Sequence, residues 1–152
     1  FRATFHGKPA HAAGEPWNGV NAVNVVQLAI HAMDMMRQQV RPETRIGTWI
    51  IAGGTASNVI PPYGELEVTV RHTERDYLNG LSEQIKKIFE GAALCTGTTV
   101  DVEFYGNPYD DVNQNHRGTH LIEDVMADMG LDFEPGPADI GGSSDIGKVS
   151  YQ

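Results

Sequence analysis

The sequence is poor in cysteine, in basic residues and in long apolar runs, and each shortage excludes a class of protein. Cys95 is the only cysteine, so one chain can form neither an internal disulfide nor a cysteine-based zinc site. No segment approaches the roughly 20 consecutive apolar residues that a membrane helix needs. The 11 basic residues against 20 acidic ones give a formal charge of −9, which disfavours nucleic acid and anionic membranes as partners. A cytoplasmic location fits the cysteine content.

The 152 residues are enough for one sizeable core, and we expect one main domain with an appendage rather than two full domains. The chain has no initiator methionine and no basic-then-apolar signal segment, so we expect a piece of a longer protein. No P-loop, dinucleotide fingerprint or nucleophile elbow occurs. Phosphoryl transfer, hydride transfer and serine hydrolysis are therefore without support.

Hydrophobic periodicity predicts strands and helices in the order β-α-β-β-α-β over roughly the first 105 residues. In the clearest strand every second residue is apolar, so one face of the sheet is open to water or to a cleft. The predicted strands lie at 1–5, 45–52, 65–71 and 100–104, and the predicted helices at 19–38 and 73–95. This order predicts an α+β, ferredoxin-like plait, a four-stranded antiparallel sheet with two helices on one face.

Turn and capping residues set the expected boundaries. Thr73 followed by Asp76 predicts a capping box for the second helix, and Gly97 predicts its end. The pair Asn107-Pro108 marks a boundary, so we expect one domain over 1–106. We expect residues 107–152 to form a second, partial α/β unit with an amphipathic helix near 117–130, and we expect this unit to stop before it can close a domain.

Three residues of the predicted plait are candidates for function. His11 lies in a loop punctuated by glycine and proline, where an imidazole can donate to a ligand oxygen or accept a proton. Asn58 lies in a glycine-rich turn and offers an amide that can donate or accept a hydrogen bond. Arg71 lies on the open sheet face, where its guanidinium suits a carboxylate.

Each candidate also has an ordinary interpretation. His11 would then be a surface histidine, and Asn58 would simply tolerate a left-handed turn conformation. Arg71 would pair with Glu65 or Glu67 on the surface, an arrangement that contributes about 0–1 kcal/mol.

Two further patterns are weaker. The run Gly141 to Asp145 precedes a possible helix and suits an anion, although such residues more often serve as an N-cap. His116 and His120 have the i, i+4 spacing of metal-binding helices. Gly118 lies between them and no general-base glutamate follows the first, which favours a solvated helix start.

Taken together, several ordered segments resemble the zinc-dependent aminoacylase and carboxypeptidase family, in particular the aminobenzoyl-glutamate hydrolases and the aminoacylase-like dipeptidases. The segments are FHGKPAHAAGEPWNGVNAV, the helix ending in MMRQQVRP, GGTASNVIPPYGELEVTVRH and GGSSDIGKVS. In that family a two-metal catalytic domain is interrupted by an inserted dimerisation or lid domain of this plait type. Residues 1–106 resemble that insert, and 107–152 resemble the start of the catalytic domain's second half.

The resemblance also implies roles for individual residues. It implies that His11 reaches the active site of the partner subunit and hydrogen-bonds the carbonyl oxygen that becomes an oxyanion when metal-bound water attacks. By the same resemblance Asn58 adds a polar contact, Arg71 binds the substrate carboxylate, and Gly142 and Ser143 line the substrate pocket.

The metal ligands and general-base glutamate of the family have no matching positions, so the resemblance implies no metal site in this chain. It implies two divalent metals, zinc or manganese, in the full-length parent. We therefore expect this chain to be the lid domain of a homodimeric, metal-dependent amidohydrolase that cleaves small amides or dipeptides next to a free carboxylate. We expect the chain to be inactive on its own.

The apolar arc of the first helix offers a dimer surface. A stand-alone ligand-binding or protein-interaction module is the alternative, since the fold alone does not fix function.

Overall fold

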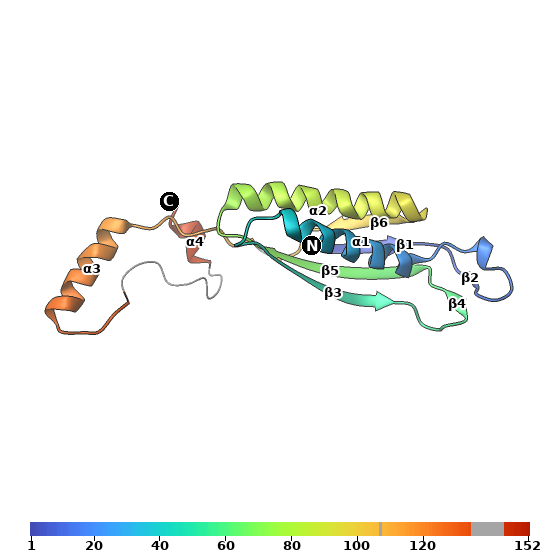
Figure 1. The fold of residues 1–152 in the computed structure, drawn as a ribbon, viewed down its shortest axis with the longest axis horizontal. Coiled ribbons are helices and arrows are strands. Elements are labelled where there is room, and N and C mark those ends of the chain that lie inside the picture. Colours follow the sequence, from blue (N-terminus) through green and yellow to red (C-terminus); the bar gives the residue numbers. More distant parts are fainter. Residues whose placement is uncertain (107, 135–144) are drawn as a thin grey trace. The chain divides into compact units, whose positions relative to one another are not determined.

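The structure is a computed structural model that describes residues 1–106, 108–134 and 145–152 (Figure 1). It divides into two units, Phe1–Gly106 and Asn107–Gln152. The first unit holds the predicted sheet, in which the strand order is β3-β5-β1-β6 and every pairing is antiparallel. Its strands are β1 (Arg2–His6), β3 (Arg45–Gly53), β5 (Tyr63–Arg71) and β6 (Thr99–Glu103).

Two helices, α1 (Ala22–Met36) and α2 (Arg75–Thr96), cover one face of this sheet, as predicted (Figure 1). The core lies between helices and sheet because each helix buries an apolar stripe against the inward-facing strand residues. Its largest fully buried side chains are Phe5, Phe89, Met33, Leu66, Ile85, Val25, Val26 and Val68. The apolar arc of α1 is thus largely covered by its own sheet, and the prediction that this arc forms the dimer surface is wrong.

The helix ends show where local signals succeed and where they fail. The side chain of Asn21 caps α1 by accepting hydrogen bonds from the backbone N–H groups of Val23 and Asn24. Gly97, at φ 72°, ends α2 as predicted. The predicted capping box at Thr73 is wrong, because α2 begins at Arg75 after Glu74, which makes no side-chain cap bond.

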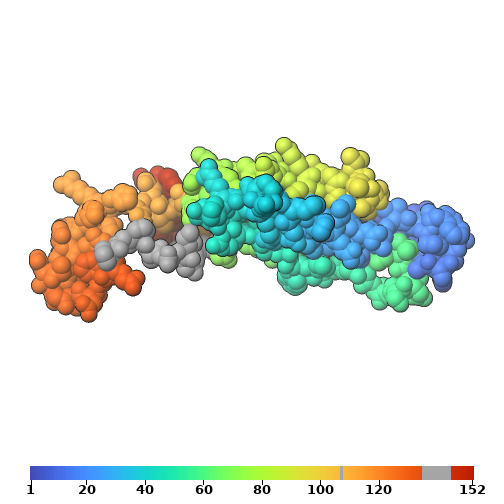
Figure 2. Space-filling model, in the orientation of Figure 1, coloured from blue at the N-terminus to red at the C-terminus, as the bar shows by residue number. Residues whose placement is uncertain are grey.

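A second, smaller sheet was not predicted. It consists of β2 (Ala10–His11) and β4 (Val59–Ile60), which pair antiparallel at one end of the main sheet (Figure 1). Two-residue strands are too short to show a periodicity of two. We call this two-stranded element the ribbon, and Figure 2 shows it at a narrow tip beyond α1 and α2.

The remaining elements are short or belong to the second unit. The 3₁₀ turns η1 (Pro16–Asn18) and η2 (Arg37–Gln39) flank α1. In the second unit, α3 (His116–Asp128) confirms the predicted amphipathic helix, and α4 (Ile146–Val149) follows later. Within the described ranges, no helix is both long enough and apolar enough to cross a membrane.

Candidate functional site

The ribbon brings two of the predicted site residues onto neighbouring rungs of one ladder, although 47 positions of sequence separate His11 from Asn58. His11 pairs with Val59, and Ala10 pairs with Ile60. The next rung continues the ladder, because the N–H of Ala12 donates to the carbonyl oxygen of Asn58 at 3.0 Å. The histidine loop and the glycine-rich turn, which the sequence presents as separate motifs, therefore form one structural element.

Backbone hydrogen bonds fasten the ribbon to the main domain. The N–H of Gly7 donates to the carbonyl oxygen of Pro62 at 2.7 Å, and Lys8 exchanges two backbone bonds with Val20 at 2.8 and 2.9 Å. Gly7 has to be glycine here, since a Cβ at this position would collide with the carbonyl oxygen of Val20. His11 is consequently carried on a fixed base rather than on a loose loop.

The ring of His11 is exposed and is anchored through one of its nitrogens. Nδ1 accepts hydrogen bonds from the backbone N–H groups of Gly14 at 3.0 Å and Ala13 at 3.2 Å. The N–H of Glu15 donates to the carbonyl oxygen of His11 at 3.1 Å, which closes a single helical turn. Sequence reasoning missed this anchor, although the residues His-Ala-Ala-Gly form a recognisable turn.

Asn58 is exposed beside this turn and its side chain has no hydrogen bond among the described residues. The left-handed interpretation is wrong, because every described residue with positive φ is a glycine. The amide of Asn58 is therefore not explained by backbone conformation.

Arg71 lies away from the ribbon. It ends the nine-residue strand β5, whose first residue Tyr63 pairs with His6 beside the ribbon. At about 3.3 Å per residue, roughly 26 Å of strand separates the two ends. Arg71 is exposed, pairs in register with Arg45, and has no ion pair among the described residues. The first unit thus carries the predicted site residues at two opposite ends of its sheet.

The carboxylates proposed as ordinary partners of Arg71 are engaged elsewhere. Arg2 lies 3.3 Å from Glu65 and 4.0 Å from Glu67. The phenol of Tyr63 donates to Glu65 at 2.6 Å, and this hydrogen bond raises the pKa of Tyr63 above its usual value. The central part of the open face is therefore occupied by internal charge pairs.

The remaining candidate residues do not add to the site at the ribbon or at Arg71. Gly142 and Ser143 lie outside the described residues. His116 begins α3 and His120 lies one turn further along it, where Nδ1 of His120 is 3.1 Å from a carboxylate oxygen of Glu123. The described ranges contain no group of three or more histidine, cysteine, aspartate or glutamate side chains suited to a metal ion.

We expect the purified chain to bind no stoichiometric zinc. A stable site needs three or four ligands, and two histidines with one carboxylate already engaged in a surface pair leave the ion largely hydrated. The number of zinc ions bound per chain is measured by calorimetric titration with zinc and by metal analysis after dialysis. One tightly retained equivalent that disappears in His116→Ala would establish a metal centre on α3 instead.

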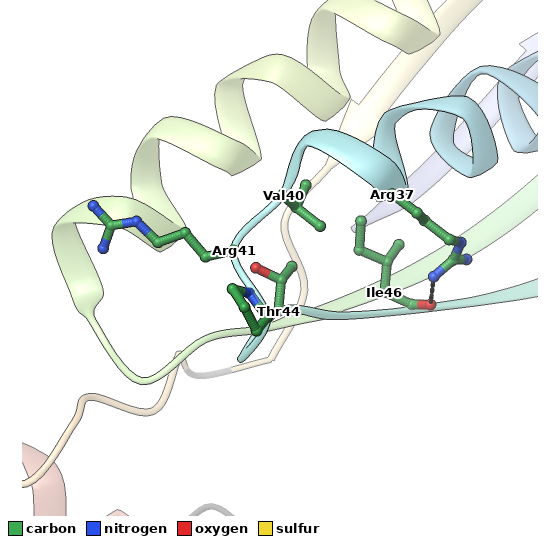
Figure 3. Close-up of a pocket in the computed structure, with 6 residues that line it drawn as sticks. Arg37, Val40, Arg41, Thr44 and Ile46 are labelled. Atoms are coloured by element: carbon green, nitrogen blue, oxygen red, sulfur yellow. Dashed lines mark hydrogen bonds between the residues drawn. The ribbon is translucent and has the colours of Figure 1, made fainter.

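A shallow pocket of about 160 Å³ lies at the Arg45 end of β3 (Figure 3). Its lining residues are Arg37, Val40, Arg41, Pro42, Thr44 and Ile46. Nη1 of Arg37 donates to the carbonyl oxygen of Ile46 at 2.8 Å, and Arg41 pairs with Glu74 at 2.6 Å. Small-molecule sites usually enclose about 300–1,000 Å³, so this pocket is smaller than a typical ligand site, and none of the predicted site residues lines it.

The architecture and the exposed histidine ribbon define a class of protein: an α+β plait that presents polar side chains at its tip. The chain belongs to the peptidase dimerisation domain family, whose sequence model matches residues 1–94. The predicted family resemblance is confirmed. Peptidases of this family are generally metal-dependent, and a dimerisation domain implies oligomerisation.

Two curated relatives illustrate the match. The Xaa-Arg dipeptidase of Mus musculus is 35% identical over 150 residues, which is 97% of this chain and 35% of that protein. A p-aminobenzoyl-glutamate hydrolase polypeptide of Escherichia coli is 32% identical over 101 residues, covering 66% of this chain and 21% of that protein. The chain spans about a third or less of the length of these relatives.

Solved structures agree on the fold. The aminopeptidase PepT of Bacillus cereus superimposes with a TM-score of 0.82 at 23% identity, covering 99% of this chain and 39% of that structure. An aminobenzoyl-glutamate utilization protein of Klebsiella pneumoniae gives 0.71 at 22% identity, covering 97% and 38%. The predicted ferredoxin-like arrangement is confirmed.

Proposed function

We propose that this chain is the lid of a metal-dependent amidohydrolase and that His11 hydrogen-bonds the substrate carbonyl oxygen in the active site of a partner subunit. The observation that carries the proposal is the anchored ring of His11 on an exposed ribbon. Only one ring nitrogen is used by the turn, which leaves the other for a ligand. The decisive test is turnover by the full-length protein carrying His11→Asn.

The proposed substrates are N-acyl or aminoacyl compounds with a free carboxylate. The names of three relatives describe compounds that end in an amino acid: Xaa-Arg, p-aminobenzoyl-glutamate and indole-3-acetyl-aspartic acid. Arg71 is the residue we assign to that carboxylate, because its guanidinium is exposed and has no carboxylate partner among the described residues. We assign a polar contact to Asn58 and pocket lining to Gly142 and Ser143.

The chemical step depends on parts of the protein outside this chain. The described residues do not fit a two-metal site, so we assign the two divalent metals, zinc or manganese, to the rest of the full-length parent. What this chain contributes is a donor for the carbonyl oxygen, which gains negative charge when the carbonyl carbon is attacked. Residues 107–152 would belong to the catalytic domain of that parent.

We further propose that the lid forms a homodimer through the free edge of β3. This edge strand has nine residues and its only charged residue is Arg45, at its start. Trp49 is 61% exposed and Ile50 is 48% exposed, one on each face of the strand. A long apolar edge with free backbone groups favours pairing with another strand, and two-fold symmetry is the usual solution for identical chains. The other edge, β6, carries Asp101 and Glu103 within five residues.

Trp49→Lys is expected to raise the dissociation constant of the dimer at least tenfold, equivalent to about 1.4 kcal/mol. The substitution removes apolar contact area and places like charges near each other across the two-fold axis. Light scattering over a dilution series measures the mass. Trp17→Lys is the matched control, since Trp17 is 76% exposed but lies in η1 beside the ribbon. Equal dissociation constants for the two variants would refute the β3 interface.

A further inference from the structure

We infer that the turn from Ala12 to Glu15 is a positioning element that holds His11 as the tautomer with its proton on Nε2. The inference rests on the proposed function of His11 and adds which atom donates. It also identifies Gly14 and Ala13, through their backbone N–H groups, as positioning residues. Neither is assigned a role by the family match.

The hydrogen bonds at Nδ1 determine the tautomer. Both donors are backbone N–H groups, at 3.0 Å from Gly14 and 3.2 Å from Ala13, and a backbone N–H cannot reverse its role. A proton on Nδ1 would point at two other protons. The neutral ring therefore carries its single proton on Nε2, at the side of the ring that the turn does not occupy.

The same geometry occurs elsewhere in this chain as an N-cap. Asn21 begins α1 by accepting from the N–H groups of Val23 and Asn24, the residues two and three positions ahead. His11 accepts from the residues two and three positions ahead in the same way, and the N–H of Glu15 closes the turn onto its carbonyl oxygen. The imidazole nitrogen thus takes the place that an asparagine oxygen takes in a helix cap.

This anchoring fixes the chemistry available to His11. A ring whose Nδ1 is an acceptor and whose Nε2 bears the proton can donate to a carbonyl oxygen without first losing or gaining a proton. It is not set up to accept a proton from an attacking group, because its only ring lone pair, on Nδ1, is occupied by the two hydrogen bonds of the turn. His11 is therefore placed to act as a hydrogen-bond donor through Nε2 rather than as a general base.

The turn predicts a specific pattern of amide protection, which can be measured on this chain without substrate. We expect hydrogen exchange at Ala13 and Gly14 to be at least about tenfold faster in His11→Ala than in the wild type, because an exposed amide loses its acceptor. His11→Asn is expected to restore the protection, since asparagine is a good N-cap. Unchanged exchange in His11→Ala would overturn the inference.

Nitrogen-15 spectroscopy of the imidazole gives an independent measurement. In its neutral form, the wild-type ring is expected to show a protonated Nε2 and an unprotonated Nδ1. Gly14→Pro removes one donor and should increase the population with a proton on Nδ1. Gly14→Ala keeps the N–H, and its Cβ would lie 3.5 Å from Nδ1, an ordinary contact, so it should keep the wild-type tautomer.

Equal tautomer populations in these two glycine variants, or a wild-type ring protonated mainly on Nδ1, would overturn the inference. Neither outcome bears on turnover. The proposed function is tested separately, by the activity of His11→Asn in the full-length protein. If the wild-type ring carries its proton on Nε2 but His11→Asn turns over substrate at the wild-type rate, the proposed function is excluded. The positioning turn would still stand.

Discussion

His11→Asn in the full-length protein is expected to lower kcat by about 10²–10³-fold, with a much smaller change in KM. A donor aimed at a developing oxyanion is worth about 2.7–4 kcal/mol in the barrier, and little of this is realised with the uncharged substrate. Asparagine retains a cap for the turn but is too short to place a donor where Nε2 lies. The variant therefore separates catalysis from the local fold.

The comparison requires two further variants. His11→Ala removes both the donor and the cap, so it should add a loss of local stability of about 0.5–2 kcal/mol to the loss of turnover. His31→Asn is the matched control, since His31 is an exposed histidine on α1 with no proposed role, and wild-type kcat is expected. Initial rates on an N-acyl amino acid give both constants. Wild-type kcat in His11→Asn would exclude the donor role.

Mixed dimers are expected to recover about half of the wild-type turnover when one subunit carries His11→Asn and the other carries Arg71→Ala. Each lid holds these residues at opposite ends of its sheet, separated by roughly 26 Å of strand β5. One small substrate cannot contact both ends of the same lid. With the roles proposed for His11 and Arg71, a complete site would take His11 from one subunit and Arg71 from the other. A two-fold dimer with one defect in each subunit would then retain one complete site.

The homodimers of each variant supply the reference rates, and both should be strongly impaired. Differently tagged subunits allow the mixed species to be purified before the assay. Were both residues supplied by the same lid, each site of the mixed dimer would contain one defect. The mixed dimer would then turn over substrate no faster than the two homodimers. That result would exclude a site that takes His11 and Arg71 from different subunits.

The elements of the main domain follow from local sequence patterns, whereas the ribbon does not. The alternation around Leu66 and Val68 fixes which face of β5 is buried, because the side chains of a strand point to opposite faces in turn. The pairing of His11 with Val59 joins segments far apart in sequence through two rungs. The hydrophobic periodicity of the sequence gives no sign of this long-range pairing. Before the start of α2, Thr73 was expected to act as the cap. The structure shows instead that Nδ1 of His72 accepts a hydrogen bond from the N–H of Glu74 at 2.9 Å.

The candidate residues were recognisable as types but not as an arrangement. A histidine in a loop and an asparagine in a glycine-rich turn are visible in the sequence, yet their adjacency depends on how β2 meets β4. The distance between Arg71 and the ribbon follows from the length of β5, which begins two residues before its predicted start. Long-range pairing, not residue chemistry, was the missing information.

The rungs that join β2 to β4 consist of backbone atoms, and this has an evolutionary consequence. The bond from Ala12 to the carbonyl oxygen of Asn58 does not depend on the side chain at position 58. Substitutions there can change the side chain presented next to His11 while the histidine keeps its place. The frame that carries the histidine is thus independent of the side chain at the neighbouring position, so the two can vary separately.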